Sequence, residues 1–143
     1  MEKIVLPNFI PAKESELYGD ALLANHTGKQ LAAVFYMRAF IEQFARRQTG
    51  ISGVATGEEI MDAYSASLPP TLRDMMPSLK EWYGKLSGPM HAADEKSARE
   101  LFDDARYAIN DHFDIRRAHK LKDATPSSSS NSTVSPPASA KTE

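Results

Sequence analysis

The sequence contains no cysteine. Disulfide bonds, thiolate nucleophiles and cysteine-ligated zinc sites are therefore excluded. A chain without cysteine fits a reducing compartment, so we expect a cytoplasmic protein.

Long apolar runs are also missing. No stretch approaches the roughly 18 consecutive apolar residues that a membrane-spanning helix requires. Near the start of the chain, Pro7 interrupts the apolar residues before they could form the apolar region of a signal peptide. We therefore expect neither export nor a membrane partner.

Positive charge is not in excess, because the formal net charge is −2. Non-specific affinity for nucleic acid comes mainly from lysine and arginine side chains that neutralise many phosphates. Strong non-specific binding is therefore not expected, and any contact with RNA must be local.

The usual motifs of metal and cofactor sites are missing as well. The four histidines include no His-x-x-x-His pair and no cluster with carboxylates at zinc-ligand spacing. We find no phosphate-binding glycine loop, no Gly-x-Ser-x-Gly elbow and no dinucleotide fingerprint. We predict no metal and no cofactor, and most familiar enzyme classes drop out.

What the sequence does contain is one ordinary globular core with two different ends. A chain of 143 residues with 41% hydrophobic and 25% charged residues is typical of a single domain. Residues 1–13, with Pro7 and Pro11, predict an extended N-terminal arm packed through Ile4, Leu6 and Phe9. Residues 122–143 are rich in serine and proline and predict a disordered tail. Residues 14–121 remain for the folded domain.

Within that domain, apolar residues recur at three- and four-residue intervals, which predicts helices. The expected helices are 14–26, 29–48, 56–64, a segment that starts at Pro77 and closes at Gly88 and Pro89, and 94–119, with one short turn at 71–76. Gly28, Gly50, a capping box at Thr56 and an N-cap at Asp94 mark the boundaries. The predicted fold class is all-α, an up-down bundle of four to five helices.

Two groups of charged or polar residues fall on the apolar faces of these helices. In the second helix, Arg38 lies amid apolar positions and Glu42 follows one turn later. Because an isolated buried ion costs several kcal/mol, we expect Arg38 to pair with Glu42. In the last helix, His112 lies within the apolar arc, Arg116 follows in the same sector, and Arg106 lies at the edge of the arc.

For each of these residues a structural role and a functional role are both open. His112 is either a satisfied core histidine or a functional group, and Arg38 with Glu42 is either a structural ion pair or part of a site. His91 is either a loop residue before the last helix or a contributor to that site.

Three sequence features carry a family resemblance. The first is a glycine and an alanine-rich stretch at residues 28–33, followed by an Arg-x-x-x-Glu segment at residues 38–42. The second is a histidine-bearing bend at residues 83–91. The third, at residues 106–112, is an arginine followed after four to six residues by a histidine. Together they resemble the HEPN superfamily of helical-bundle proteins, and especially a bacterial branch of uncharacterised HEPN-like proteins. The similarity spans roughly residues 14–121.

The resemblance implies a metal-independent protein that cleaves RNA or binds a nucleotide, acting as a homodimer with the site at the shared interface. In that scheme His112 is the base, Arg106 binds the phosphate, and Arg116 or His91 is an auxiliary donor. Six residues turn His112 about 120° from Arg106, so the two share a site only if the helix unwinds or two subunits combine their residues.

Three hypotheses follow. We prefer a HEPN-like binding and dimerisation module in which the polar residues hold an interface, with RNA or a nucleotide as candidate ligand. The first alternative is a metal-independent endoribonuclease or toxin-type component that uses Arg106 and His112. The second is an accessory protein of a phage or mobile element whose tail recruits a protein partner.

Overall fold

The computed structural model describes the backbone of residues 6–129 and the side chains of residues 6–121. This part of the chain contains no strand and is built from helices: η1 (Ala12–Glu14, a short 3-10 helix), α1 (Ser15–His26), α2 (Gln30–Thr49), α3 (Gly57–Ser67), α4 (Pro70–Met75), α5 (Leu79–Ala92) and α6 (Glu95–Ser129). The predicted all-α fold class is confirmed.

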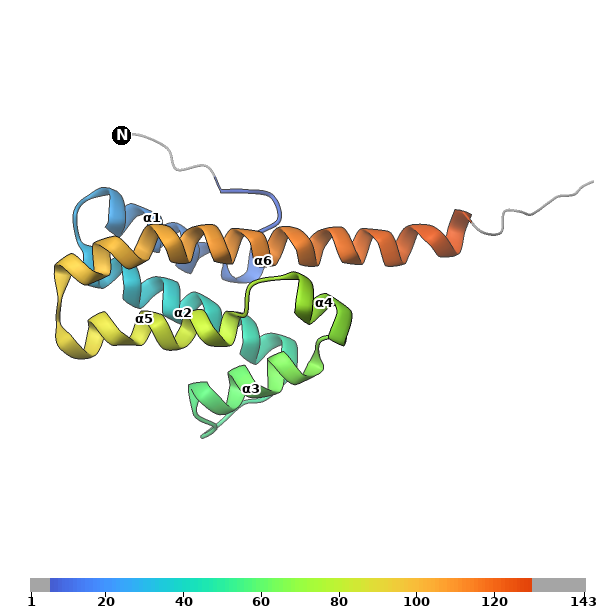
Figure 1. Ribbon diagram of the computed structural model, residues 1–143, viewed down its shortest axis with the longest axis horizontal. Helices are drawn as coiled ribbons and strands as arrows, with labels where there is room; N and C mark the ends of the chain where they lie inside the picture. Colours follow the sequence, from blue (N-terminus) through green and yellow to red (C-terminus); the bar gives the residue numbers. More distant parts are fainter. Residues whose placement is uncertain (1–5, 130–143) are drawn as a thin grey trace, which may run out of the picture.

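The four longest helices form an up-down bundle (Figure 1). α2 lies in the middle and packs against α1, α3, α5 and α6. Its residues pair with α5 in antiparallel register, because Arg38 contacts Ser87 and Glu42 contacts Tyr83. α6 runs parallel to α2, since Leu31 lies level with Glu95 and Gln48 lies level with Arg116.

The core is aromatic around the middle of α2. Phe40 and Phe44 both meet Phe113 of α6 edge to face, with ring centroids 5.4 and 4.6 Å apart. All three rings are almost fully buried. Edge-to-face pairs of this kind add to the stabilisation that burial of the rings provides. They fix α6 against α2 and thereby fix the residues that follow Phe113.

Several predicted boundaries are confirmed. Gly28 and Gly50 take the left-handed conformation, at φ +83° and +73°, where a glycine is favoured. Thr56 and Glu59 form the predicted capping box, and the Asp94 carboxylate accepts hydrogen bonds from the first turn of α6. Local backbone conformation and side-chain capping therefore determine these ends.

The predicted limits of the fourth long segment are wrong. Pro77 precedes the helix, because Ser78 is the N-cap and accepts from the Glu81 amide. At the other end, α5 continues through Gly88 and Pro89, and the stop comes at Ala93, with φ +52°. The Pro89 carbonyl accepts from the amides of both Ala93 and Asp94. A proline in the last turn loses one amide donor, and here its ring is buried, so the helix tolerates it.

Both ends of the domain also differ from prediction. The arm is not extended throughout, because the Ile10 amide donates to the Pro7 carbonyl and η1 follows. Leu6 and Phe9 pack against the core as expected, while Ile4 lies outside the described residues. α6 continues to Ser129, past the expected end at His119, since no glycine or proline interrupts it before Pro126. The remainder of the predicted tail, residues 130–143, lies outside the described residues.

No helix over residues 6–129 combines the length and the apolar character needed to cross a lipid bilayer.

Candidate functional site

The site is built around Arg38, which α2 holds on the flank facing α5. The Arg38 Nε donates a hydrogen bond of 2.7 Å to Ser87 Oγ, and its guanidinium carbon lies 4.3 Å from the centre of the Tyr83 ring. Stacking on an aromatic face together with one hydrogen bond fixes the plane of a guanidinium. Ser87 is itself fixed, since its hydroxyl donates to the Tyr83 carbonyl 3.1 Å away.

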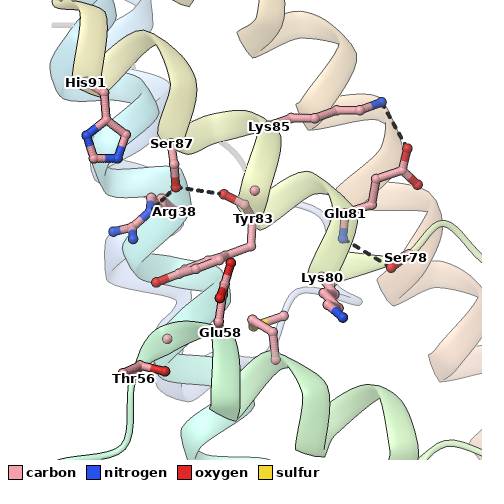
Figure 2. Close-up of a pocket in the computed structure, with 13 residues that line it drawn as sticks. Arg38, Thr56, Glu58, Ser78, Lys80, Glu81, Tyr83, Lys85, Ser87 and His91 are labelled. Carbon is pink, nitrogen blue, oxygen red and sulfur yellow. Dashed lines mark hydrogen bonds and ion pairs between the residues drawn. The ribbon is translucent and has the colours of Figure 1, made fainter.

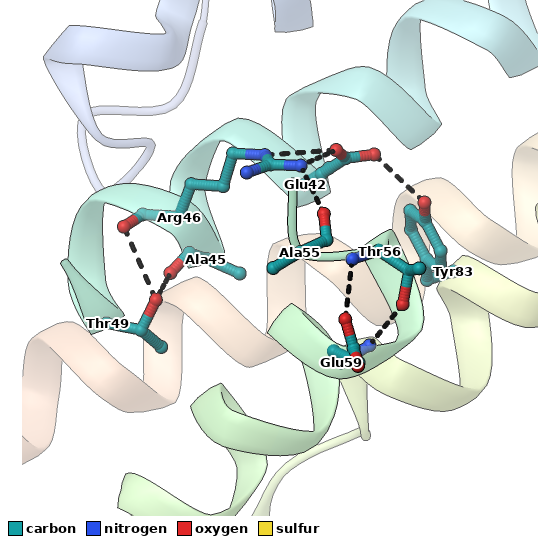
Figure 3. Close-up of polar contacts among 8 residues, drawn as sticks. All are labelled: Glu42, Ala45, Arg46, Thr49, Ala55, Thr56, Glu59 and Tyr83. Carbon is teal, nitrogen blue, oxygen red and sulfur yellow. Dashed lines mark hydrogen bonds and ion pairs between the residues drawn. The ribbon is translucent and has the colours of Figure 1, made fainter. Parts of the chain in front are cut away.

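The expected Arg38–Glu42 pair is wrong. Glu42 instead pairs with Arg46 at 3.0 Å and accepts a hydrogen bond of 2.9 Å from the Tyr83 hydroxyl. Arg46 also donates to the Ala55 carbonyl, which ties the end of α2 to the segment before α3 (Figure 3). Both arginines lie one turn from Glu42, and the tertiary contact with Ala55 favours Arg46.

Tyr83 therefore separates a cation from an anion. Its ring face carries Arg38, and its hydroxyl faces Glu42. Burial, followed by the hydrogen bond to Glu42, raises the pKa of Tyr83 to about 12, so the phenol stays protonated and remains the donor. Glu42 is satisfied by Arg46 and Tyr83. Within the described residues, Arg38 has no carboxylate partner.

Arg38 lines a cleft of about 720 Å³ between α5 and the start of α3. In Figure 2, Arg38, Ser87 and His91 gather at one end of this cleft, and Lys80 and Ser78 lie toward the other. His91 is exposed on the last turn of α5. The structure thus brings together Arg38 and His91, two of the predicted site residues.

The lysines at the rim of the cleft are already neutralised. Lys85 pairs with Glu81 at 3.1 Å on the side of α5 away from Arg38, and Lys80 pairs with Asp62. These pairs are exposed and contribute little to stability. Both lysines are thus paired, whereas the described residues give Arg38 no ion-pair partner.

Close packing fixes the floor of the cleft. A Cβ atom on Gly57 would lie 1.9 Å from the Tyr83 hydroxyl oxygen, closer than any real contact. The first turn of α3 therefore rests directly on Tyr83 because residue 57 has no side chain. The geometry of the Arg38 platform depends on this contact.

His112 has the environment of a structural residue. It is 1% exposed, and both ring nitrogens are engaged. A carbonyl only accepts, so Nδ1 donates to Pro77 O at 2.8 Å, and the unprotonated Nε2 accepts from the Tyr64 hydroxyl at 2.8 Å. Burial lowers the pKa of His112 to about 4. A general base works best with a pKa near the operating pH, so this geometry favours the core-histidine interpretation.

Arg106 and His112 do not meet within the chain. Arg106 is exposed on the flank of α6 that faces α1, where its charge acts on Tyr18, and Tyr18 donates a hydrogen bond to Asn110. His112 faces Tyr64 of α3 and the segment before α5. The separation matches the turn of about 120° that six helical residues produce.

Arg116 lies near neither the cleft nor Arg106. It is half-buried beside Phe44, with its guanidinium carbon 5.0 Å from the ring centre, and it donates to Gln48 Oε1 at 3.0 Å. Its charge acts on Tyr64, which hydrogen bonds to His112. The helix-wheel placement of Arg38, His112 and Arg116 toward the protein is confirmed, although they belong to different clusters.

Sequence reasoning missed Tyr83 and Ser87, which form the support for Arg38. The spacing of Tyr83 and Ser87, four residues apart in a predicted helix, put both on one face. The sequence pattern did not predict that this face meets Arg38, because the hydrogen bond between Arg38 and Ser87 joins residues 49 positions apart.

Within residues 6–121, no three histidine, aspartate or glutamate side chains gather as metal ligands. The resemblance to the HEPN superfamily stays a prediction. Neither a family model, nor a curated protein, nor a solved structure matches this chain.

Proposed function

We propose that this protein is a binding module that holds a phosphate-bearing ligand, of the nucleotide or RNA class, in the cleft between α3 and α5. The observation that carries the proposal is Arg38, a cation fixed at its Nε and at its ring face but without a carboxylate partner among residues 6–121. A guanidinium has five N–H donors, and only one is used by Ser87. The terminal nitrogens are left to donate to an anion.

Arginine suits this role because its planar fork matches two oxygens of a phosphate. The platform of Tyr83 and Ser87 removes much of the conformational freedom that the side chain would otherwise lose on binding. His91 at the same end of the cleft supplies a second donor, and the hydroxyls of Thr56 and Ser78 line the walls. These features are those of a recognition site for a phosphate group.

The endoribonuclease alternative receives less support. Its base, His112, is buried and engaged at both nitrogens, and Arg106 lies on another flank of the same helix. In a shared site, Arg106 of a second subunit would have to reach His112, which is buried away from solvent. No observation favours the toxin hypothesis or the phage-accessory hypothesis. The tail that the latter needs, residues 122–143, lies largely outside the described residues.

The binding proposal is tested in a calorimeter by titrating the full chain with mononucleotides, with the corresponding nucleosides, which lack the phosphate, and with a short RNA. We expect saturable binding that requires the phosphate, and Arg38→Gln should weaken it about tenfold or more, since a charge-assisted bidentate contact is lost.

Lys85→Gln is the matched control, because it removes a positive charge from the same rim but from a residue already paired with Glu81. It should bind nearly as the wild type does. If the wild-type chain binds none of these ligands, or if the two variants lose affinity equally, the cleft is not a phosphate site.

A further inference from the structure

A second group of cations lies where the end of α2 meets α6. It consists of Arg47, Arg116 and Lys120, called here the basic cluster. Arg116 and Lys120 are one helical turn apart on α6, and the hydrogen bond from Arg116 to Gln48 places them beside the last turn of α2. The proposed function does not use this cluster.

The cluster is separate from the cleft. Arg38 and Arg47 are nine residues apart on α2, and at about 100° per residue they lie on opposite sides of that helix. A ligand at one arginine therefore cannot touch the other.

One buried ring positions two of the three cations. The guanidinium carbons of Arg47 and Arg116 lie 5.9 and 5.0 Å from the centre of the Phe44 ring. Phe44 is fully buried and packed against Phe113 and Tyr64, so this platform is rigid. Two like charges are thus held against one side chain by the core itself.

Within residues 6–121 the basic cluster has more positive than negative charge. Glu14 binds Arg47 through both oxygens, at 2.7 and 2.8 Å. Arg116 donates to the neutral amide of Gln48, and within residues 6–121 it forms no ion pair. Among the side chains of residues 6–121, these three cations therefore share one carboxylate, and neither the half-buried Arg116 nor Lys120 has one of its own.

The pKa values of two cations in the cluster reflect this excess of positive charge. The charge of Arg116, then burial, then the charge of Arg47 lower the pKa of Lys120. Burial is the main cause that lowers the pKa of Arg116; the charge of Arg47 adds to it, while Tyr64 and Glu14 act in the opposite direction. Lys120 is largely exposed, so solvent weakens the repulsion that it feels. An added anion would relieve it.

We infer that the basic cluster is a second ligand site, which binds an oxyanion of the phosphate class between Arg116, Lys120 and Arg47. A phosphate group can accept hydrogen bonds from two guanidinium groups and an ammonium at once, because it presents several oxygens in different directions. The donors project from two packed helices and not from loops, so binding needs no rearrangement of the backbone.

The inference is tested by titrating the isotope-labelled full chain with inorganic phosphate and with pyrophosphate at constant ionic strength. Arginine Nε–H signals report on the site directly. We expect saturable shifts of the Arg47 and Arg116 signals, larger than those of the arginines outside this cluster and the cleft. Lys120→Gln should weaken pyrophosphate binding about tenfold, the effect of losing one charge-assisted contact. Lys120 is exposed, so this change should leave the fold intact.

Arg99→Gln is the matched control. It removes the same charge from an exposed position of the same helix, about 25 Å from Arg116 at 1.5 Å per residue. Arg38→Gln is a second control and separates this site from the cleft. Both variants should bind pyrophosphate at the cluster as the wild type does. Shifts that do not saturate, or an equal loss in Arg99→Gln and Lys120→Gln, would overturn the inference.

Discussion

His112 and Arg38 are both polar residues on apolar helix faces, and their surroundings separate their roles. Every hydrogen-bonding group of His112 is used within the fold, by Pro77 and Tyr64. Arg38 uses one donor on Ser87 and rests on Tyr83, while its charge is not neutralised by a carboxylate. A buried group that is fully satisfied stabilises the protein, whereas a fixed but unneutralised cation is suited to binding.

The environment of His112 makes stability depend on pH. Its folded pKa, about 4, lies below the ordinary value of 6.5, so the unfolded chain takes up the proton first. The contribution is fully present above pH 6.5 and is lost as the pH falls toward 4. We expect the free energy of unfolding to drop by about 2 kcal/mol between pH 6.5 and about pH 5.

Urea unfolding at both pH values measures this drop, and His112→Gln provides the comparison. The variant is less stable at pH 6.5, because Tyr64 and Pro77 lose a well-placed partner, but its stability should change less with pH. A wild type and a variant with the same pH slope would show that other groups cause the dependence.

At the scale of elements, the cleft results from how α3 meets α5. The capping box at Thr56 starts α3 at a defined residue, and Gly57 lets its first turn touch Tyr83. The same Tyr83 supports Arg38 of α2. Three helices therefore share one aromatic side chain, so a small displacement of α3 would also disturb the arginine.

Gly57→Ala should destabilise the protein by about 1–3 kcal/mol, the usual cost of forcing extra volume into a packed site. It should also weaken ligand binding in the cleft. Thermal and urea unfolding provide the measurement.

Gly19→Ala in α1 is the matched control, because no atom lies within 4 Å of the added Cβ. Replacing glycine by alanine in an unobstructed helix usually stabilises by about 0.5–1 kcal/mol. If both variants gained stability, the contact between Gly57 and Tyr83 would not be rigid.

At the scale of the whole molecule, α6 is longer than the bundle that it packs on. In Figure 1 its C-terminal part projects beyond the other helices. Scattered apolar side chains are exposed on several elements, including Leu23 of α1, Phe35 of α2 and Tyr107 of α6. Single exposed apolar residues are normal on monomers, so they do not by themselves establish an interface.

The homodimer expected from the HEPN resemblance is a prediction for the whole chain. Sedimentation velocity over a wide range of protein concentrations should reveal a species of twice the monomer mass. If the protein sediments as a monomer throughout, a shared active site between subunits is excluded, and the cleft of a single chain remains the candidate.

The sequence by itself determined the helices and most of their ends. Apolar spacing predicted the helices and part of their buried faces, and Gly28, Gly50, Thr56 and Asp94 act through backbone conformation or a cap within a few residues. Such short-range effects are readable along the chain. The predicted stop at Gly88 and Pro89 is wrong. Proline weakens a helix only locally, and here burial of its ring and the left-handed turn at Ala93 decide where α5 ends.

Only the tertiary structure decided which polar residues act together. Arg38 and Glu42 are neighbours on one helix, yet Glu42 pairs with Arg46, and Arg38 rests on Tyr83 of another helix. Arg106 and His112 are close in sequence and face different elements. The physical reason is that the net energy of a charged contact depends on burial and on competing partners, and both are set by helices that meet from distant parts of the chain.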